Sequence, residues 1–290
     1  MLLRTHPPEP RTDDDPHGRG NAARDVAHVG RRAPGALPGR RDRPRGGCHG
    51  RVEAVSTLTE LLRQATAHEV RAATSTPFAW RLARGELERT HYVRLLANLQ
   101  ALYAELEWAL MWNRQHPAVG PLCLPELWRN ELLQDDLRAL LGQGWYSSVP
   151  RQDAVAHVER LGLLCDEAPA LLAAHAWVLY ATDLPGGSQG GAGIARPLGL
   201  RGKEGTSFLR HATHLDGESY RAHLLDTLDQ LRLDERSREA LVEEARLAVR
   251  TVRSLFEALG RNLPVVREQR ERVRAGGWWL RPLALARETS

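Results

Sequence analysis

The chain has 290 residues, of which 42% are hydrophobic, so it can bury the core of one large domain or of two smaller ones. Its formal net charge is +4, and the cations are almost all arginine, because Lys203 is the only lysine. Three cysteines are too few and too scattered for a disulfide framework or a paired-cysteine metal site. No apolar run is long enough to span a membrane, and the first residues lack the apolar region of a signal peptide. We therefore expect a cytoplasmic protein with no membrane span.

The first part of the chain differs sharply in composition from the rest. Residues 1–50 contain ten arginines, seven prolines and eight glycines, but no phenylalanine, tryptophan or tyrosine. Such a segment buries too little apolar surface to offset the entropy lost on ordering. Because no aromatic side chain is interleaved with the arginines to stack on bases, we expect no nucleic-acid binding. Residues 1–54 are predicted to be a disordered basic extension.

From Ser56 onward the apolar residues follow helical spacing. Thr57 and Glu60 have the spacing of a capping box at a helix start. No run of β-branched residues alternates with polar ones, as a strand would require. The sequence predicts one all-α domain over residues 55–262, followed by a basic tail over 263–290. Beyond the first helix, we expect helices over 91–115, 124–141, 151–165, 168–184, 218–231 and 234–259.

The segment over 175–191 is the most informative in the chain. A buried-type helical run leads to one acid, Asp183, and then breaks into a patch of glycines that begins at Gly186 and Gly187. Glycine costs a helix roughly 1 kcal/mol relative to alanine, so a run of glycines needs a reason. A kink, or a backbone that must lie flat against a ligand, would supply one. A plain glycine-rich loop is the other interpretation.

Several motifs, in order, resemble those of the haem oxygenases. The stretch LLAAHAWVLYATDLPGGSQ at 171–189 resembles the distal-helix motif of that family, and LRQAT at 62–66 resembles the start of its proximal helix. Matches to the family's middle and C-terminal helices are YAELE at 103–107, PELWRN at 125–130, YRAHLLDTLDQL at 220–231 and SLFEAL at 254–259. The resemblance covers about residues 57–260.

The resemblance implies a fold in which haem lies between a proximal and a kinked distal helix. It implies that Asp183 orders a water that supplies protons for oxygen chemistry at the haem. Gly186 and Gly187 would bring the backbone close to the porphyrin. Arg63 and Arg221 would face the haem propionates, and Tyr180 matches a distal-pocket tyrosine.

The chain departs from the family pattern at the iron ligand. An alignment without gaps puts the family's proximal histidine at Val70, which cannot bind iron. His68 is the nearest imidazole, and it becomes the expected iron ligand if the helix shifts by two residues. Without that shift His68 points to the opposite flank, because two residues rotate a side chain by about 200°. Leu179 also replaces an arginine of the family motif.

The expected function is that of a haem oxygenase, a monooxygenase that opens haem to biliverdin, Fe²⁺ and CO. It would use O₂ and electrons from a reductase or ferredoxin, and a phytochrome could take the biliverdin. The first alternative is a haem-binding or haem-carrying protein of the same fold that has lost turnover with the missing ligand. The second is a helical enzyme of the same shape that acts on another small ligand. Fold alone does not separate these alternatives.

Overall fold

The structure is a computed structural model, and it describes residues 56–182, 194–200, 204–209 and 217–263. All regular elements in these ranges are helical, and no strand occurs among them, which confirms the all-α prediction. The predicted extension and nearly all of the predicted tail lie outside the described residues, so their boundaries stay predictions. None of the helices in the described part is long and apolar enough to cross a membrane.

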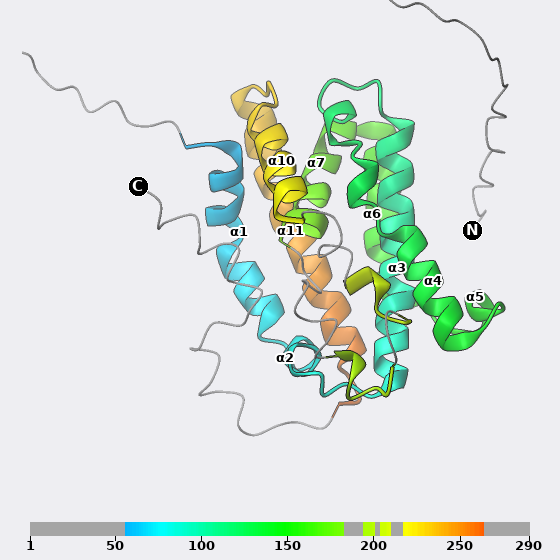
Figure 1. Ribbon diagram of the computed structural model, residues 1–290. Coiled ribbons are helices and arrows are strands. Elements are labelled where there is room, and N and C mark those ends of the chain that lie inside the picture. The colour runs from blue at the N-terminus through cyan, green and yellow to red at the C-terminus, as the bar shows by residue number, and fades with distance from the viewer. Residues whose placement is uncertain (1–55, 183–193, 201–203, 210–216, 264–290) are drawn as a thin grey trace, which may run out of the picture. The chain divides into compact units, whose positions relative to one another are not determined.

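The longer helices, labelled as in Figure 1, are α1 (Leu58–Thr74), α2 (Pro77–Arg84), α3 (Arg89–Trp112), α4 (Asn130–Leu141), α6 (Val155–Glu167), α10 (Gly217–Asp229) and α11 (Glu235–Leu259). The shorter segments are η1 (Gly120–Leu122), η2 (Pro125–Leu127), α5 (Trp145–Ser148), η3 (Gln152–Ala154), η4 (Pro169–Leu171), α7 (Leu172–Ala176) and the π-helical turn η5 (Trp177–Ala181). The helix expected over 168–184 is thus three consecutive pieces, and the last of them is widened. A π-helical turn is rare and is often found at functional sites.

Helix α1 begins where the sequence predicts, because Thr57 caps it by accepting the backbone N–H of Glu60 at 3.3 Å. One face of α1 is buried, and the helix packs along α11 (Figure 1). Asp229 at the end of α10 accepts hydrogen bonds from the backbone N–H and the hydroxyl of Thr59. These contacts hold α1 against both C-terminal helices. The buried residues of α1 are Leu58, Leu62, Thr66, Val70 and Ala73.

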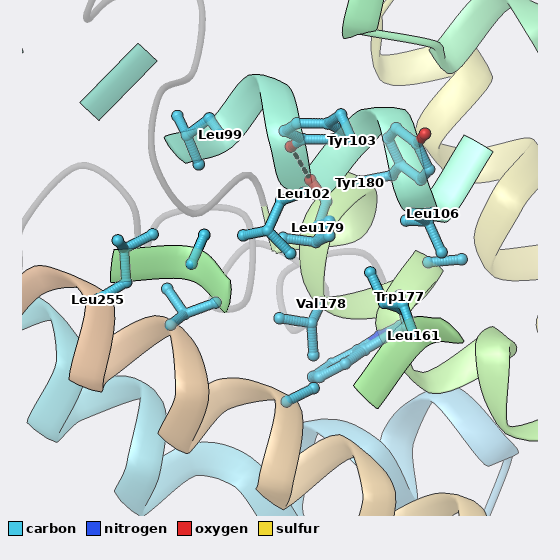
Figure 2. Packing of buried hydrophobic residues seen from close by; sticks show 14 of the residues in the cluster. Leu99, Leu102, Tyr103, Leu106, Leu161, Trp177, Val178, Leu179, Tyr180 and Leu255 are labelled. Carbon is cyan, nitrogen blue, oxygen red and sulfur yellow. Dashed lines mark hydrogen bonds between the residues drawn. The ribbon is translucent and has the colours of Figure 1, made fainter. Parts of the chain in front are cut away.

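Helix α3 supplies much of the core and packs against α4, α6 and α7. Figure 2 shows its apolar side chains beside those of η5, with the hydroxyl of Tyr103 donating to the carbonyl of Leu179 at 2.8 Å. Because Tyr103 is buried, its hydroxyl needs a partner, and η5 supplies a backbone carbonyl. This bond fixes the widened turn to the centre of the domain.

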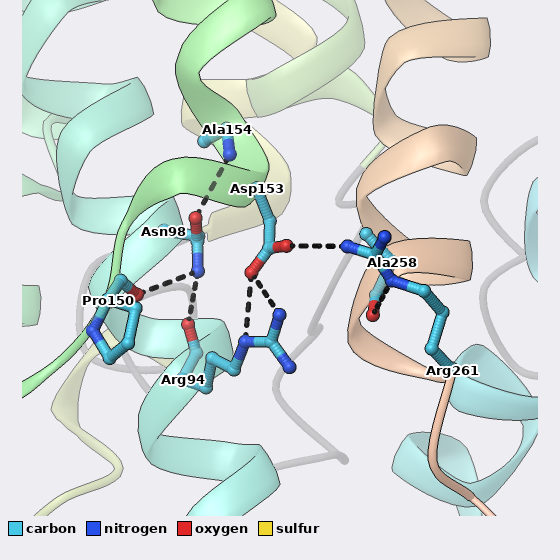
Figure 3. A network of polar contacts seen from close by, with 7 residues as sticks. All are labelled: Arg94, Asn98, Pro150, Asp153, Ala154, Ala258 and Arg261. Carbon is cyan, nitrogen blue, oxygen red and sulfur yellow. Dashed lines mark hydrogen bonds and ion pairs between the residues drawn. The ribbon is translucent and has the colours of Figure 1, made fainter.

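A buried carboxylate, Asp153, ties three parts of the domain together (Figure 3). It accepts a hydrogen bond from Arg94 of α3 at 2.8 Å and one from Arg261, just beyond α11, at 3.2 Å. Nearby, Asn98 accepts the backbone N–H of Ala154 at 3.0 Å and donates to the carbonyl of Arg94. These bonds fix the start of α6, the helix that carries His157, relative to α3.

Candidate functional site

The buried face of α1 presents Val70, at the position where the gapless alignment puts the iron ligand. Val70 is 3% exposed and Thr66 is 1% exposed, whereas His68, the predicted iron ligand, is exposed to solvent. The buried face of α1 thus carries Val70, whereas His68 lies on its exposed face.

The two arginines predicted to meet the haem propionates lie on neighbouring helices, because α1 packs against α10. Arg63 already donates from Nε to Oε2 of Glu60, one turn earlier in α1, at 2.7 Å. This hydrogen bond raises the pKa of the Arg63 guanidinium, although partial burial opposes the shift. Arg221 of α10 is partly exposed.

Tyr180, the predicted distal-pocket tyrosine, is buried and faces α3. Its hydroxyl donates to Oε1 of Glu107 at 3.2 Å, and its ring lies against that of Tyr103, with centroids 5.5 Å apart (Figure 2). Burial raises the pKa of the Tyr180 hydroxyl well above its ordinary value, and the nearby Glu107 carboxylate adds to the effect. The hydroxyl of Tyr180 is thus a neutral donor with a protein partner.

Glu107 is a buried acid that the sequence reasoning missed. It also accepts the backbone N–H groups of Arg129 and Asn130, at 2.6 and 3.2 Å. Burial raises the pKa of Glu107 to about 7, although these hydrogen bonds act in the opposite direction. A carboxyl group with a pKa near neutrality is a frequent component of functional sites. The available signal was its position one turn after Tyr103, on the buried face of a mostly apolar helix.

A second buried acid, Asp136, holds the described segment 204–209 against α4. Its two carboxylate oxygens accept the backbone N–H groups of Ser207 and Phe208, at 2.8 and 2.9 Å. Burial raises the pKa of Asp136 to about 6. Its neighbour Asp135 is exposed and pairs with Arg138, so the adjacent acids point apart and form no catalytic pair, as expected from helical geometry.

The most buried polar cluster joins α6, α7 and α11. Nε2 of His157 lies 2.9 Å from Nδ1 of His175, and Nε2 of His175 lies 2.9 Å from Oε1 of Glu244. Arg160 donates to the same carboxylate, from Nε to Oε1 at 3.0 Å. The two histidines are 2% and 0% exposed, and Glu244 is 5% exposed. Nothing in the sequence spacing indicates that these side chains meet.

The pKa values of Glu244 and His157 show which of these two groups carries a charge. Burial of Glu244 opposes its ionisation, but hydrogen bonds from His175 and Arg160 outweigh burial and lower its pKa to about 2. Burial lowers the pKa of His157 well below its ordinary value, and the neighbouring His175 adds to the effect. Glu244 is therefore an anion near neutral pH, and His157 is neutral.

The remaining predicted site residues, Asp183, Gly186 and Gly187, lie outside the described residues. The last described residue before them is Thr182, which is buried and whose hydroxyl donates to the carbonyl of Val178. Across the described ranges, no three histidine, cysteine or acidic side chains are grouped as they would be to hold a metal ion.

Comparison with known proteins identifies the fold. The sequence model of the haem oxygenase family matches residues 56–258. Haem oxygenase 2 of Synechocystis is 32% identical over 71% of this chain and 84% of its own length, and haem oxygenase 1 of Nostoc is 29% identical over 72% and 88%.

Solved structures agree with the sequence relatives. The crystal structure of haem oxygenase-1 from Synechocystis in complex with haem has a TM-score of 0.67 and 27% identity, and the match covers 71% of this chain and 94% of that one. The haem oxygenase of Leptospira interrogans has a TM-score of 0.66 and 27% identity, with 70% and 100% covered. The chain belongs to the haem oxygenase family.

Proposed function

We propose that this protein is a haem oxygenase, which uses O₂ and reducing electrons to open haem to biliverdin, Fe²⁺ and CO. The observation that carries the proposal is the family match over residues 56–258, which includes nearly every described helix. The likeness to haem oxygenases solved with haem supports haem as the substrate. A haem carrier without turnover is not favoured, because the named relatives are oxygenases.

The acid proposed to orient a proton-donating water is Asp183. In the sequence it comes two residues after η5, whose backbone is fixed by the bond between Tyr103 and Leu179. Gly186 and Gly187 are proposed to lie against the porphyrin, because a residue without Cβ lets the backbone approach a ligand closely. Tyr180, in the turn that precedes this segment in the sequence, donates its hydroxyl to Glu107.

The iron is proposed to have an axial ligand other than His68. The alignment without gaps supports this, because it puts Val70, and not His68, at the family's ligand position. Haem itself supplies the redox chemistry, and the protein contributes position and proton supply. Arg63 and Arg221 are proposed to meet the propionates, where Arg63 would share its positive charge between Glu60 and a propionate.

Two partner proteins are part of the proposal. The reaction needs electrons that the chain does not carry, so a reductase or ferredoxin is the expected donor. A phytochrome that takes up biliverdin is one expected consumer of the product. Neither is required for a test of the reaction itself, because a chemical reductant can replace the donor.

The test is a titration of the full chain with haemin, followed by ascorbate and air. We expect saturation at one haem per chain with a sharp Soret band, and then conversion to biliverdin with release of CO. Binding without conversion would favour the haem carrier. Failure to bind haem would overturn both readings and favour a helical enzyme with another ligand.

A further inference from the structure

The cluster of His157, His175 and Glu244 has a defined hydrogen-bond direction. A carboxylate can only accept, so Nε2 of His175 must be the donor to Glu244. When His175 is neutral, its Nδ1 has no proton and accepts from Nε2 of His157. Neutral His157 then has an unprotonated Nδ1. The carboxylate therefore determines which nitrogen carries the proton in both rings.

The inner end of this chain is a buried base. Nδ1 of His157 is buried, and none of the described side chains or backbone groups hydrogen-bonds it. A buried polar atom without a protein partner costs about 1–3 kcal/mol, so such an atom calls for an explanation. In this tautomer Nδ1 of His157 is an unprotonated base, so a proton can bind to the His157–His175 pair at this atom.

The outer end of the chain reaches the surface. Arg160, whose side chain is 37% exposed, forms an ion pair with the buried carboxylate of Glu244. Glu244 from α11 is thus the charged group that hydrogen-bonds the histidine pair, Arg160 from α6 acts on Glu244, and Glu167 acts on Arg160 in turn. A buried base is connected in this way to a surface ion pair through two rings.

We propose that Glu244, His175 and His157 form a proton relay for the haem site, with Nδ1 of His157 as its inner end. A proton that binds Nδ1 of His157 releases the proton on Nε2, which passes to Nδ1 of His175. One N–H bond forms and one breaks on His157, and no electrons are exchanged. The positive charge comes to rest on His175, where the Glu244 carboxylate lies 2.9 Å away. The reverse transfer returns the proton to the inner end.

This arrangement reduces the cost of placing a positive charge in the core. An isolated imidazolium in the core is costly, and His157 resists protonation for that reason. Passing the charge to His175 places it against an anion instead. His175 lies in α7, which continues into η5, and Asp183 comes two residues after η5 in the sequence. The relay rests on the proposed function, because only haem turnover would use it.

The first test needs no haem. Long-range ¹H–¹⁵N correlation spectra of the full chain report which ring nitrogen carries the proton, and the His157 signals are identified by their loss in His157→Gln. We expect His157 to be neutral with its proton on Nε2 between about pH 6 and 8. We expect Glu244→Gln to increase the fraction of His175 protonated on Nδ1, because the acceptor that fixes its tautomer is removed. A proton on Nδ1 of His157 in the unchanged chain would overturn the relay.

The second test is haem turnover with ascorbate. Glu244→Gln is expected to slow biliverdin formation about tenfold or more, to change its pH profile and to increase its solvent deuterium isotope effect. The matched control is Glu243→Gln, the same change at the next residue, where the side chain is 62% exposed. The control should turn over haem like the unchanged chain.

His157→Gln keeps the test decisive if Glu244→Gln folds poorly. The glutamine amide can still donate to His175, but it cannot pass a proton from one side to the other. We expect normal haem affinity with slowed turnover. Turnover equal to that of Glu243→Gln in both variants would overturn the relay while the proposed function stands. An unchanged chain that degrades no haem would overturn both.

Discussion

Helix α1 and the core around α7 and η5 differ in whether their histidine and acidic side chains are buried. The buried face of α1 ends in Val70 and Ala73, and its one nearby imidazole, His68, is exposed. Around α7, in contrast, two histidines and an acid are buried together, and a second acid lies beneath Tyr180. The difference teaches that buried titratable groups gather around α7 and η5, whereas the buried face of α1 is mostly apolar.

The largest effect is expected from Asp183→Asn, which tests the distal half of the comparison. Asparagine has nearly the same size as aspartate but cannot ionise, so haem should still bind. Biliverdin formation should fall by about 10²-fold, the usual scale of a lost acid–base group. The measurement is the turnover rate together with a haemin titration. An unchanged rate and product would show that Asp183 does not supply the proton.

Val70→His tests the α1 half of the comparison. Because Val70 takes the place of the family's proximal histidine in the alignment without gaps, an imidazole there should reach the iron and produce a histidine-bound haem spectrum. Haem affinity should rise about tenfold, since an iron–histidine bond adds to the existing contacts. Absorption and resonance Raman spectra of the haem complex give the answer. A spectrum identical to that of the unchanged chain would show that this face of α1 does not meet the haem.

The pKa of Glu107 predicts a pH dependence of stability. Burial raises its pKa to about 7 from an ordinary 4.5, so the folded state binds more protons between these values, and stability contributed by Glu107 falls as pH rises. Glu107→Gln removes this loss, because an amide does not ionise.

As pH rises from 5 to 8, the free energy of unfolding of Glu107→Gln should increase by about 2 kcal/mol relative to that of the unchanged chain. Urea unfolding at both pH values measures the gain, with exposed Glu131→Gln as the control. A gain equal to that of the control would contradict a raised pKa at Glu107.

The smallest effect is expected from deletion of residues 1–50. Their composition gives them too little apolar surface to join the core. Helix content, melting temperature and haem affinity should therefore stay the same within error. A large drop in melting temperature would mean that this segment packs against the helical domain.

The fold was predictable because helical periodicity is a local property of the sequence. The Thr57 cap and the long apolar faces of α3 and α11 could be read directly, and the burial of Val70 follows from helical geometry once the register is known. The break of the distal helix into α7 and η5 was not visible, because a π-helical turn has no simple residue pattern.

The buried polar clusters could not be read from the sequence for a different reason. His157 and His175 are 18 residues apart, and Glu244 is 69 residues beyond His175, so only the packing of three helices brings them together. Glu107 likewise owes its raised pKa to burial, while the hydrogen bonds that oppose the shift come from Tyr180 and from the backbone of Arg129 and Asn130, all on other segments. Partners separated by this much sequence leave no spacing to recognise.

The most direct test of the account is biliverdin formation by His68→Ala and the unchanged chain, measured side by side. The account predicts equal rates and equal haem spectra, because it proposes an axial ligand other than His68, which lies on the exposed face of α1. Loss of activity in His68→Ala, restored by added imidazole, would show that His68 is the iron ligand and would contradict the assignment of the α1 face.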